Sequence, residues 1–199
     1  MSPISPAWFS GFDALFELFF AVISLTISYF AYKIYQLSDQ RPVKLLSFSF
    51  LFISLAYVAR SMSNFLPFLD VISIYTHIIL FLTGLSILLY MTLKPNRTTF
   101  WVLLAATLLS LVFISNILLA YYILSSVYLA LISWHYIQNF LSNRQTKTLL
   151  VALAFIFLFF GSFHFFMSVN HELFYVIGYF LELLAYLLIL ANLYLVLKK

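Results

Sequence analysis

The sequence predicts an all-α membrane protein, a bundle of seven transmembrane helices with its N-terminus outside and its C-terminus in the cytoplasm. Hydrophobic residues make up 65% of the 199 positions and charged residues only 8%, whereas a soluble domain is about half apolar and a quarter charged. Apolar runs recur near the ~20 residues that a helix needs to cross a bilayer. Short connections leave no linker or second domain, so residues 1–199 are expected to form a single transmembrane domain.

Seven apolar segments are expected to span the bilayer. The run from Thr99 to Phe140 is about twice as long as one span at ~1.5 Å per residue. We therefore place a tight hairpin at Ser115-Asn116, the only polar dipeptide near the middle of this run. Prolines and polar turn residues separate most of the other segments. The predicted spans are residues 13–35, 43–65, 71–93, 99–115, 117–140, 148–168 and 172–197.

Lysine and arginine are distributed as the positive-inside rule requires for this orientation. They lie at alternate connections and in the C-terminal tail, at Lys33, Arg41, Lys44, Lys94, Arg97, Arg144, Lys147, Lys198 and Lys199. Arg60 alone falls towards the outer face. Because these residues are scattered over short loops and do not cluster on one face, no nucleic-acid partner is expected. The sequence predicts a multi-pass protein of the cell membrane in contact with the lipid bilayer.

A weak internal repeat relates the first three spans to the last three. A shift of 104 residues matches Leu37-Ser38 and Leu45-Leu46 with Leu141-Ser142 and Leu149-Leu150. The same shift places Arg60 opposite His164, and a shift of 105 places His77 opposite Glu182. The pattern is typical of a parallel three-plus-one-plus-three duplication, as in some transporters. The alternative is a chance match between leucine-rich segments.

Ionisable side chains within the spans are the candidate functional residues. A charge at bilayer depth costs about 2.5–3.5 kcal/mol, so such residues usually face the bundle interior and find partners. At ~1.5 Å per residue, Glu182 lies near the midplane and the others lie roughly 6–11 Å below the outer surface. Each lies on a stripe of small or polar residues at helical spacing, and Tyr179 shares the stripe of Glu182. The predicted outward-facing pocket for a small molecule, ion or proton consists of Glu17, Arg60, His77, His164, Tyr179 and Glu182.

Two interpretations of Arg60 remain open. In the first, Glu17 or Glu182 holds Arg60 inside the bundle, where its guanidinium would suit an anionic ligand. In the second, Arg60 extends to the outer surface and pairs with Asp70. If the buried polar residues only satisfy one another in pairs and leave no cavity, the chain is instead a non-catalytic accessory subunit that packs against membrane protein partners.

Histidines offer two further hypotheses. His77 and His164, at matched depth on different spans, suit bis-imidazole ligation of one haem b in an electron-transfer subunit. A zinc hydrolase would draw on these histidines or His171, with Glu172 or Asp70. No His-x-x-x-His or His-Glu-x-x-His motif supports the hydrolase, and without cysteine there is no thiolate metal site. The sequence therefore favours a protein that is not an enzyme.

The seven-span layout with an external N-terminus resembles that of microbial rhodopsins, G-protein-coupled receptors and three-plus-one-plus-three sugar transporters, in topology alone. Retinal proteins carry a Schiff-base lysine in the middle of the seventh helix, where this chain has Glu182, so no retinal is expected. The Asp-Arg-Tyr and Asn-Pro-x-x-Tyr motifs of the receptors and the Pro-Gln pair of the sugar transporters are absent. The leading hypothesis is a carrier or a sensor with an outward-facing pocket.

Overall fold

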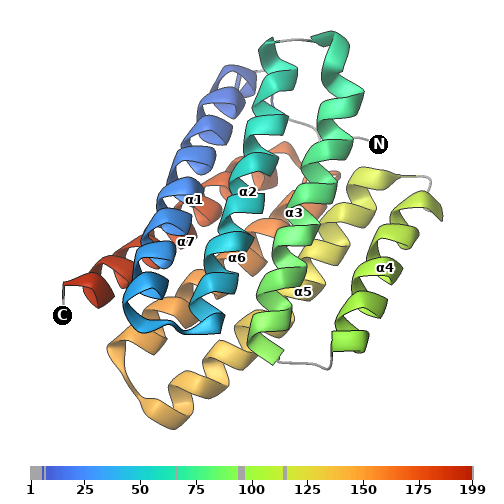
Figure 1. Cartoon of the computed structure of the whole chain (residues 1–199). Helices are drawn as coiled ribbons and strands as arrows, with labels where there is room; N and C mark the ends of the chain where they lie inside the picture. Colours follow the sequence, from blue (N-terminus) through green and yellow to red (C-terminus); the bar gives the residue numbers. More distant parts are fainter. Residues whose placement is uncertain (1–5, 7, 66, 94–96, 114–115, 199) are drawn as a thin grey trace.

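Seven α-helices make up most of the chain in the computed structural model, which describes residues 6, 8–65, 67–93, 97–113 and 116–198 (Figure 1). No strand occurs within these ranges, so the prediction of an all-α fold is confirmed. The helices are α1 (Ser10–Ser38), α2 (Arg41–Phe65), α3 (Asp70–Leu93), α4 (Arg97–Phe113), α5 (Ile117–Asn143), α6 (Thr146–Met167) and α7 (Glu172–Leu197), with a 3₁₀ turn η1 (Pro67–Leu69) before α3.

Six of these helices are long and apolar enough to cross a membrane, namely α1, α2, α3, α5, α6 and α7. α4 has 17 residues and is shorter than the rest. The helices coincide closely with the apolar segments of the sequence because polar residues and prolines interrupt the helical runs at the same places. The chain is therefore a multi-pass helical membrane bundle.

Helix ends in this protein are fixed by local backbone and side-chain hydrogen bonds. Asp39 ends α1 and Arg144 ends α5 in the same left-handed conformation, with φ of 50° and 47°, and these two residues are 105 positions apart. Asn116 caps α5, and its side chain accepts a hydrogen bond from the backbone N–H of Leu119 at 3.2 Å. This cap lies where the hairpin was predicted; Ser115 lies outside the described residues.

The six long helices form a closed ring. In the described parts of the chain, α1 contacts α2, α2 contacts α3, α3 contacts α5, α5 contacts α6, α6 contacts α7, and α7 returns to α1. Among the described residues, α4 contacts only α3 and α5, so it lies outside the ring (Figure 1). α1, α3, α5 and α7 all finish at the same end of the bundle, where the α1–α2 and α5–α6 connections also lie (Figure 1).

Buried serines and glycines bring the ring helices close together. Ser28 on α1 and Ser47 on α2 each donate a hydroxyl hydrogen bond to the other's carbonyl, at 2.8 and 2.9 Å. Ser49 donates to the carbonyl of Gly84 on α3 at 2.7 Å, and a Cβ on Gly84 would lie only 2.9 Å from the carbonyl oxygen of Ser49. Such small-residue contacts are characteristic of helix packing in membranes, where apolar side chains gain little by leaving lipid.

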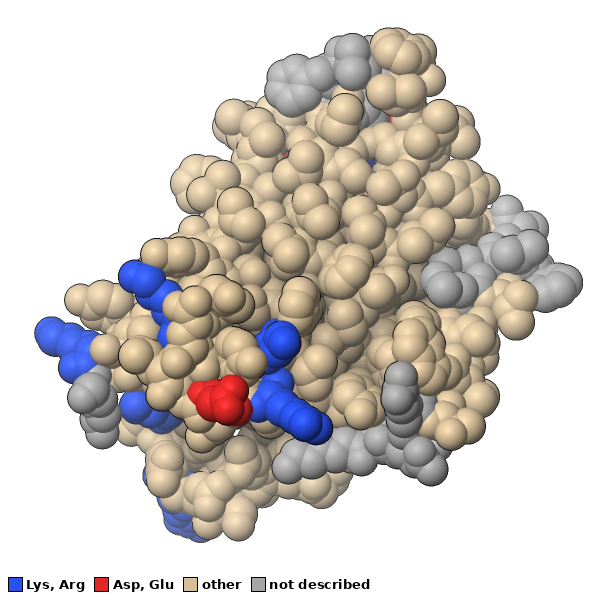
Figure 2. All heavy atoms as spheres, in the orientation of Figure 1, with Lys and Arg blue, Asp and Glu red and all other residues tan. Residues whose placement is uncertain are grey.

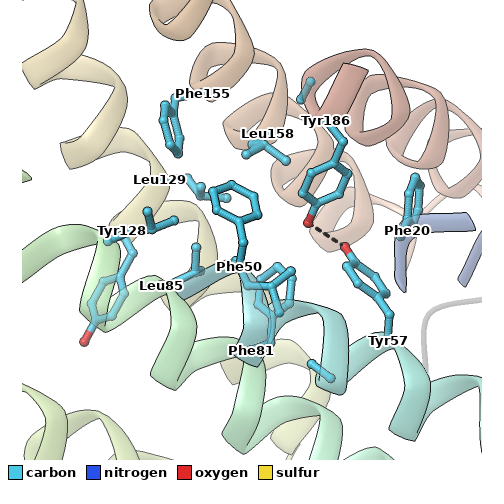
Figure 3. Packing of buried hydrophobic residues seen from close by; sticks show 14 of the residues in the cluster. Phe20, Phe50, Tyr57, Phe81, Leu85, Tyr128, Leu129, Phe155, Leu158 and Tyr186 are labelled. Atoms are coloured by element: carbon cyan, nitrogen blue, oxygen red, sulfur yellow. Dashed lines mark hydrogen bonds between the residues drawn. The ribbon is translucent and has the colours of Figure 1, made fainter. Parts of the chain in front are cut away.

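Charge and hydrophobicity are segregated on the molecular surface. Figure 2 shows lysine and arginine gathered at the end that holds the α1–α2 and α5–α6 connections, with a mainly uncharged surface along the helices. Large hydrophobic side chains such as Phe19, Val71, Trp134 and Phe180 are more than half exposed there. Such a surface suits contact with lipid. Inside, aromatic residues such as Phe50, Phe155 and Tyr186 are fully buried (Figure 3).

Candidate solute-binding cavity

A cavity of about 260 Å³ lies inside the helix ring, between residues of all six ring helices. No described residue of α4 lines it. Its ionisable lining residues, apart from tyrosines, are Asp13, Glu17, Arg60, Asp70, His77 and Glu182. Tyr179, which the sequence also placed in the pocket, lines it as well. A cavity of this size is not expected if the buried polar residues only satisfy one another.

The cavity reaches the surface at the end of the bundle opposite the basic connections. Asp70, the first residue of α3, has a side chain that is 55% exposed, and the Arg60 side chain is 31% exposed. Both residues belong to the end where α2 finishes and α3 begins. Glu17 and Glu182 are instead buried. The charged residues therefore run from an accessible rim to an enclosed floor.

Arg60 forms an ion pair with each of two carboxylates, the buried Glu17 and the exposed Asp70. Its Nε lies 3.3 Å from Oε1 of Glu17, and its Nη1 lies 3.9 Å from Oδ1 of Asp70. The Glu17 side chain is only 4% exposed, so the nearby guanidinium offsets the cost of burying this carboxylate. The two interpretations of Arg60 are thus combined: it lies inside the bundle against Glu17, and it also reaches Asp70. The sequence left open whether Glu17 or Glu182 would hold Arg60 inside the bundle, and Arg60 contacts Glu17.

Glu182 lies at the floor of the cavity and is 6% exposed. Its Oε2 accepts a hydrogen bond from the hydroxyl of Tyr57 on α2 at 3.0 Å. The oxygens of Tyr57 and Tyr186 are 3.1 Å apart (Figure 3). Because Tyr57 gives its single proton to Glu182, Tyr186 is the donor of this second bond. A Cβ on Gly161 would lie 3.1 Å from Cγ of Glu182, so the glycine makes room for the carboxylate at the α6–α7 contact.

A second pair of tyrosines is arranged in the same way nearer the rim. Tyr175 donates to Oδ2 of Asp13 at 3.4 Å, and its oxygen is 3.2 Å from that of Tyr179. By the same proton count, Tyr179 donates to Tyr175. The cavity thus contains two carboxylates that each accept a hydrogen bond from the end of a tyrosine pair. This geometry orients phenol oxygens and carboxylates towards one volume.

His77 contributes an imidazole whose two nitrogens are both engaged. Nδ1 lies 3.0 Å from the carbonyl oxygen of Ala56, and Nε2 lies 3.1 Å from the hydroxyl oxygen of Tyr121. Since a carbonyl only accepts, Nδ1 carries the proton and donates it. In the neutral imidazole, Nε2 then accepts the proton of Tyr121. His77 therefore belongs to the hydrogen-bonded wall of the cavity, between α2 and α5.

His164 does not line the cavity, unlike the other residues that the sequence placed there. Its Nδ1 donates to the carbonyl of Phe160 in its own helix at 2.7 Å, and its ring packs against Phe174 with centroids 5.5 Å apart. The two histidines paired as haem ligands in the sequence therefore do not share this cavity. Within the described ranges, no group of three or more His, Cys, Asp or Glu residues is arranged to hold a metal ion.

Tyr121 and Tyr122, at the start of α5, are cavity residues that sequence reasoning missed. Both follow the predicted hairpin within an apolar run, where tyrosines usually indicate packing or an interface. The signal that could have found them is their alignment with the Phe16-Glu17 pair of the first span at a shift of 105.

The ring and its cavity define a class of protein, a multi-pass helical membrane protein with a polar cavity that opens at one end of the bundle. Comparisons with protein-family models, curated protein sequences and solved structures find no match to this chain.

Proposed function

We propose that this chain is a seven-span carrier that binds a small solute in the outward-facing cavity. The observation that carries the proposal is the convergence of costly ionisable side chains from four ring helices, α1, α2, α3 and α7, on one cavity that all six ring helices line. A volume of about 260 Å³ lies just below the ~300–1,000 Å³ typical of small-molecule sites. The solute is therefore smaller than a typical drug molecule.

The direction of the helices supports a count of seven spans. α3 and α5 are ring neighbours that run in the same direction, so the chain must return between them from one end of the bundle to the other (Figure 1). α4 makes this return. Its 17 residues extend for about 26 Å at ~1.5 Å per residue, close to the ~30 Å thickness of the hydrocarbon core. This length supports α4 as the fourth of seven spans.

The orientation is supported by the basic end of the bundle. The positive-inside rule assigns the end with the α1–α2 and α5–α6 connections to the cytoplasm (Figure 2). The mouth of the cavity, at Arg60 and Asp70, is at the opposite end and faces outwards. In this arrangement the site takes up its solute from outside the cell.

A duplication of a three-helix unit supports a carrier in preference to a simple receptor. At a shift of 105, seven lining residues of α1–α3 correspond to lining residues of α5–α7. The pairs are Asp13 with Leu118, Glu17 with Tyr122, Tyr57 with Ser162, Arg60 with Phe165, Asp70 with Tyr175, Ile74 with Tyr179, and His77 with Glu182.

Contacts between helices follow the same shift. His77 bonds the backbone of Ala56, and Glu182 contacts Gly161, which are again 105 positions apart. The helix-ending residues Asp39 and Arg144 form a further pair. Carriers built from repeats place their substrate site at the repeat interface and move one repeat against the other.

Binding and transport should both depend on Glu182. Purified protein in lipid nanodiscs is screened against small cationic, anionic and neutral solutes by thermal shift, and the solutes that bind are tested for uptake in proteoliposomes. We expect wild-type protein to be stabilised by at least one solute and to transport it with saturable kinetics. Glu182→Gln should lose both properties.

The matched control is Glu172→Gln, which neutralises an exposed carboxylate in the first turn of the same helix and should behave as wild type. Wild-type binding and uptake by Glu182→Gln would remove the central residue of the proposal. Binding without uptake would identify a sensor and reject the carrier.

A further inference from the structure

We infer that the solute is a small organic cation, an alkylammonium compound with its charged group between Glu182 and the tyrosines of the cavity. The inference rests on the proposed function and assigns the chemical class of its ligand. Three features of the cavity support it: the charge balance of its lining, the ion pairs of Arg60, and the aromatic character of the wall formed by α5–α7.

The charge balance of the lining is acidic. Four carboxyl groups, on Asp13, Glu17, Asp70 and Glu182, face one guanidinium, on Arg60. The two nitrogens of His77 are engaged by a carbonyl and a phenol and add no charge in the neutral form. Such a site attracts cations and repels anions.

Arg60 is poorly placed to receive an anion. Its Nε lies 3.3 Å from Glu17, and its Nη1 lies 3.9 Å from Asp70. An incoming anion would have to compete with the Glu17 carboxylate, which is almost completely buried and would then lose its counter-charge. Removing one partner from a buried ion pair is strongly unfavourable. Arg60 therefore serves to neutralise Glu17 and Asp70.

Glu182 differs from Glu17 in the kind of partner it has. It is 6% exposed, and its one hydrogen bond in the described structure comes from the neutral hydroxyl of Tyr57 to Oε2. A buried carboxylate compensated only by a neutral donor gains greatly from a cation. Glu182 lines the cavity, so an ammonium group in this volume can supply that charge. α7 itself contains no lysine or arginine that could pair with Glu182. The basic residues that follow α7, Lys198 and Lys199, belong to the C-terminal tail.

The wall opposite the ion pairs is aromatic. Where α1–α3 carry Glu17, Arg60 and Asp70, the positions 105 residues later carry Tyr122, Phe165 and Tyr175. Tyr57, Tyr121 and Tyr179 complete the aromatic lining near Glu182. Aromatic rings and a carboxylate together are the groups that bind quaternary and primary ammonium ions, through the negative face of each ring. At these three positions, the α1–α3 half of the ring carries the ion-paired residues and the α5–α7 half carries aromatic rings.

The test compares ligands of equal shape and different charge. Wild-type protein in nanodiscs is titrated by calorimetry with choline, with n-butylammonium, with butyrate, and with dimethylbutanol, in which carbon replaces the choline nitrogen. We expect at least one ammonium compound to bind, and choline or butylammonium to bind about tenfold or more tightly than the neutral and anionic probes. Glu182→Gln should weaken ammonium binding about tenfold or more, while Glu172→Gln leaves it unchanged.

A second pair of variants keeps the inference testable if Glu182→Gln does not fold. Tyr179→Leu removes a ring from the aromatic wall and should weaken ammonium binding several-fold, whereas Tyr179→Phe keeps the ring and should retain most of it. Butyrate or dimethylbutanol binding as tightly as the ammonium probes would overturn the cationic class and leave a solute-binding cavity. Failure of every probe, whatever its charge, to bind would overturn the proposed function as well.

Discussion

Tyr57 on α2 donates a hydrogen bond to Glu182 on α7 at 3.0 Å, across 125 residues of sequence. This bond joins the first three helices of the ring to the last three at the floor of the cavity. Tyr186 donates in turn to Tyr57, so the three side chains form one connected set. Buried polar sets of this kind stabilise a fold only while every member keeps its partner.

Replacing Tyr57 by phenylalanine tests this set. Tyr57→Phe removes the donor to Glu182 and the acceptor of Tyr186, and we expect it to lower the free energy of unfolding by about 1–3 kcal/mol because buried polar atoms lose their partners. Tyr75→Phe is the control, because Tyr75 is 47% exposed on α3. Unfolding in a mild detergent series measures both. Equal stability of the two variants would show that the Tyr57 bond does not contribute.

The α6–α7 contact should not tolerate a methyl group at Gly161. A Cβ there would lie 3.1 Å from Cγ of Glu182 and 3.2 Å from the carbonyl oxygen of Gly178. We expect Gly161→Ala to destabilise the protein by about 1–3 kcal/mol, as overpacking does, and to weaken solute binding by displacing Glu182. In Gly11→Ala the new methyl meets no atom within 4 Å, so its melting temperature should match or exceed that of wild type.

Arg60 and Glu17 should be energetically coupled. Arg60→Gln leaves the buried Glu17 carboxylate without this counter-charge, and we expect a loss of about 2–4 kcal/mol, below the value for a fully buried pair because Arg60 is 31% exposed. The double variant with Glu17→Gln should recover part of this loss in a double-mutant cycle. Asp70→Asn should change stability by less than about 1 kcal/mol, since Asp70 is exposed and 3.9 Å away. Additive effects of Arg60→Gln and Glu17→Gln would contradict the pairing.

The seven-span topology can be mapped with single cysteines because the natural chain has none. Gln40→Cys, which follows α1, and Ser142→Cys, in the last turn of α5, should react only with reagents on the cytoplasmic side. Phe68→Cys and Asn170→Cys should react only from outside. Mass spectrometry after labelling of intact cells and of inverted vesicles measures the side. If α4 did not cross the membrane, Gln40→Cys and Ser142→Cys would label from opposite sides.

Hydropathy and helix-breaking residues predicted the all-α fold and nearly all helix ends, because in a membrane the length of apolar segments is imposed by the bilayer. The burial cost of charge placed Glu17, Arg60, His77 and Glu182 on inward faces, and in the structure these residues line one cavity. The number of spans and the orientation stay predictions.

His164 is a residue whose position outside the cavity could not be predicted from sequence periodicity. It lies three residues after Gly161, which made it appear to share an inward stripe, but the cavity-lining residues of α6 are Ser162 and Phe165. The imidazole of His164 is satisfied by the carbonyl of Phe160 in its own helix. A local bond of this kind makes a polar residue tolerable outside a pocket, and sequence periodicity cannot detect it. Partner choice is equally hidden, since the choice of Arg60 between Glu17 and Glu182 depends on helix rotation.

Accessibility of the cavity from outside is the central claim, and one cysteine measures it most directly. Ser162 lines the cavity on α6, and Ser162→Cys is a small change in a chain without other thiols. The membrane-impermeant cation trimethylammonium-ethyl methanethiosulfonate, added outside, should modify Ser162→Cys rapidly. It should not modify Ser86→Cys, which is 0% exposed on α3 and does not line the cavity. A Ser162→Cys thiol that is as unreactive as that of Ser86→Cys, or that reacts only from the cytoplasmic side, would contradict an outward-facing solute site.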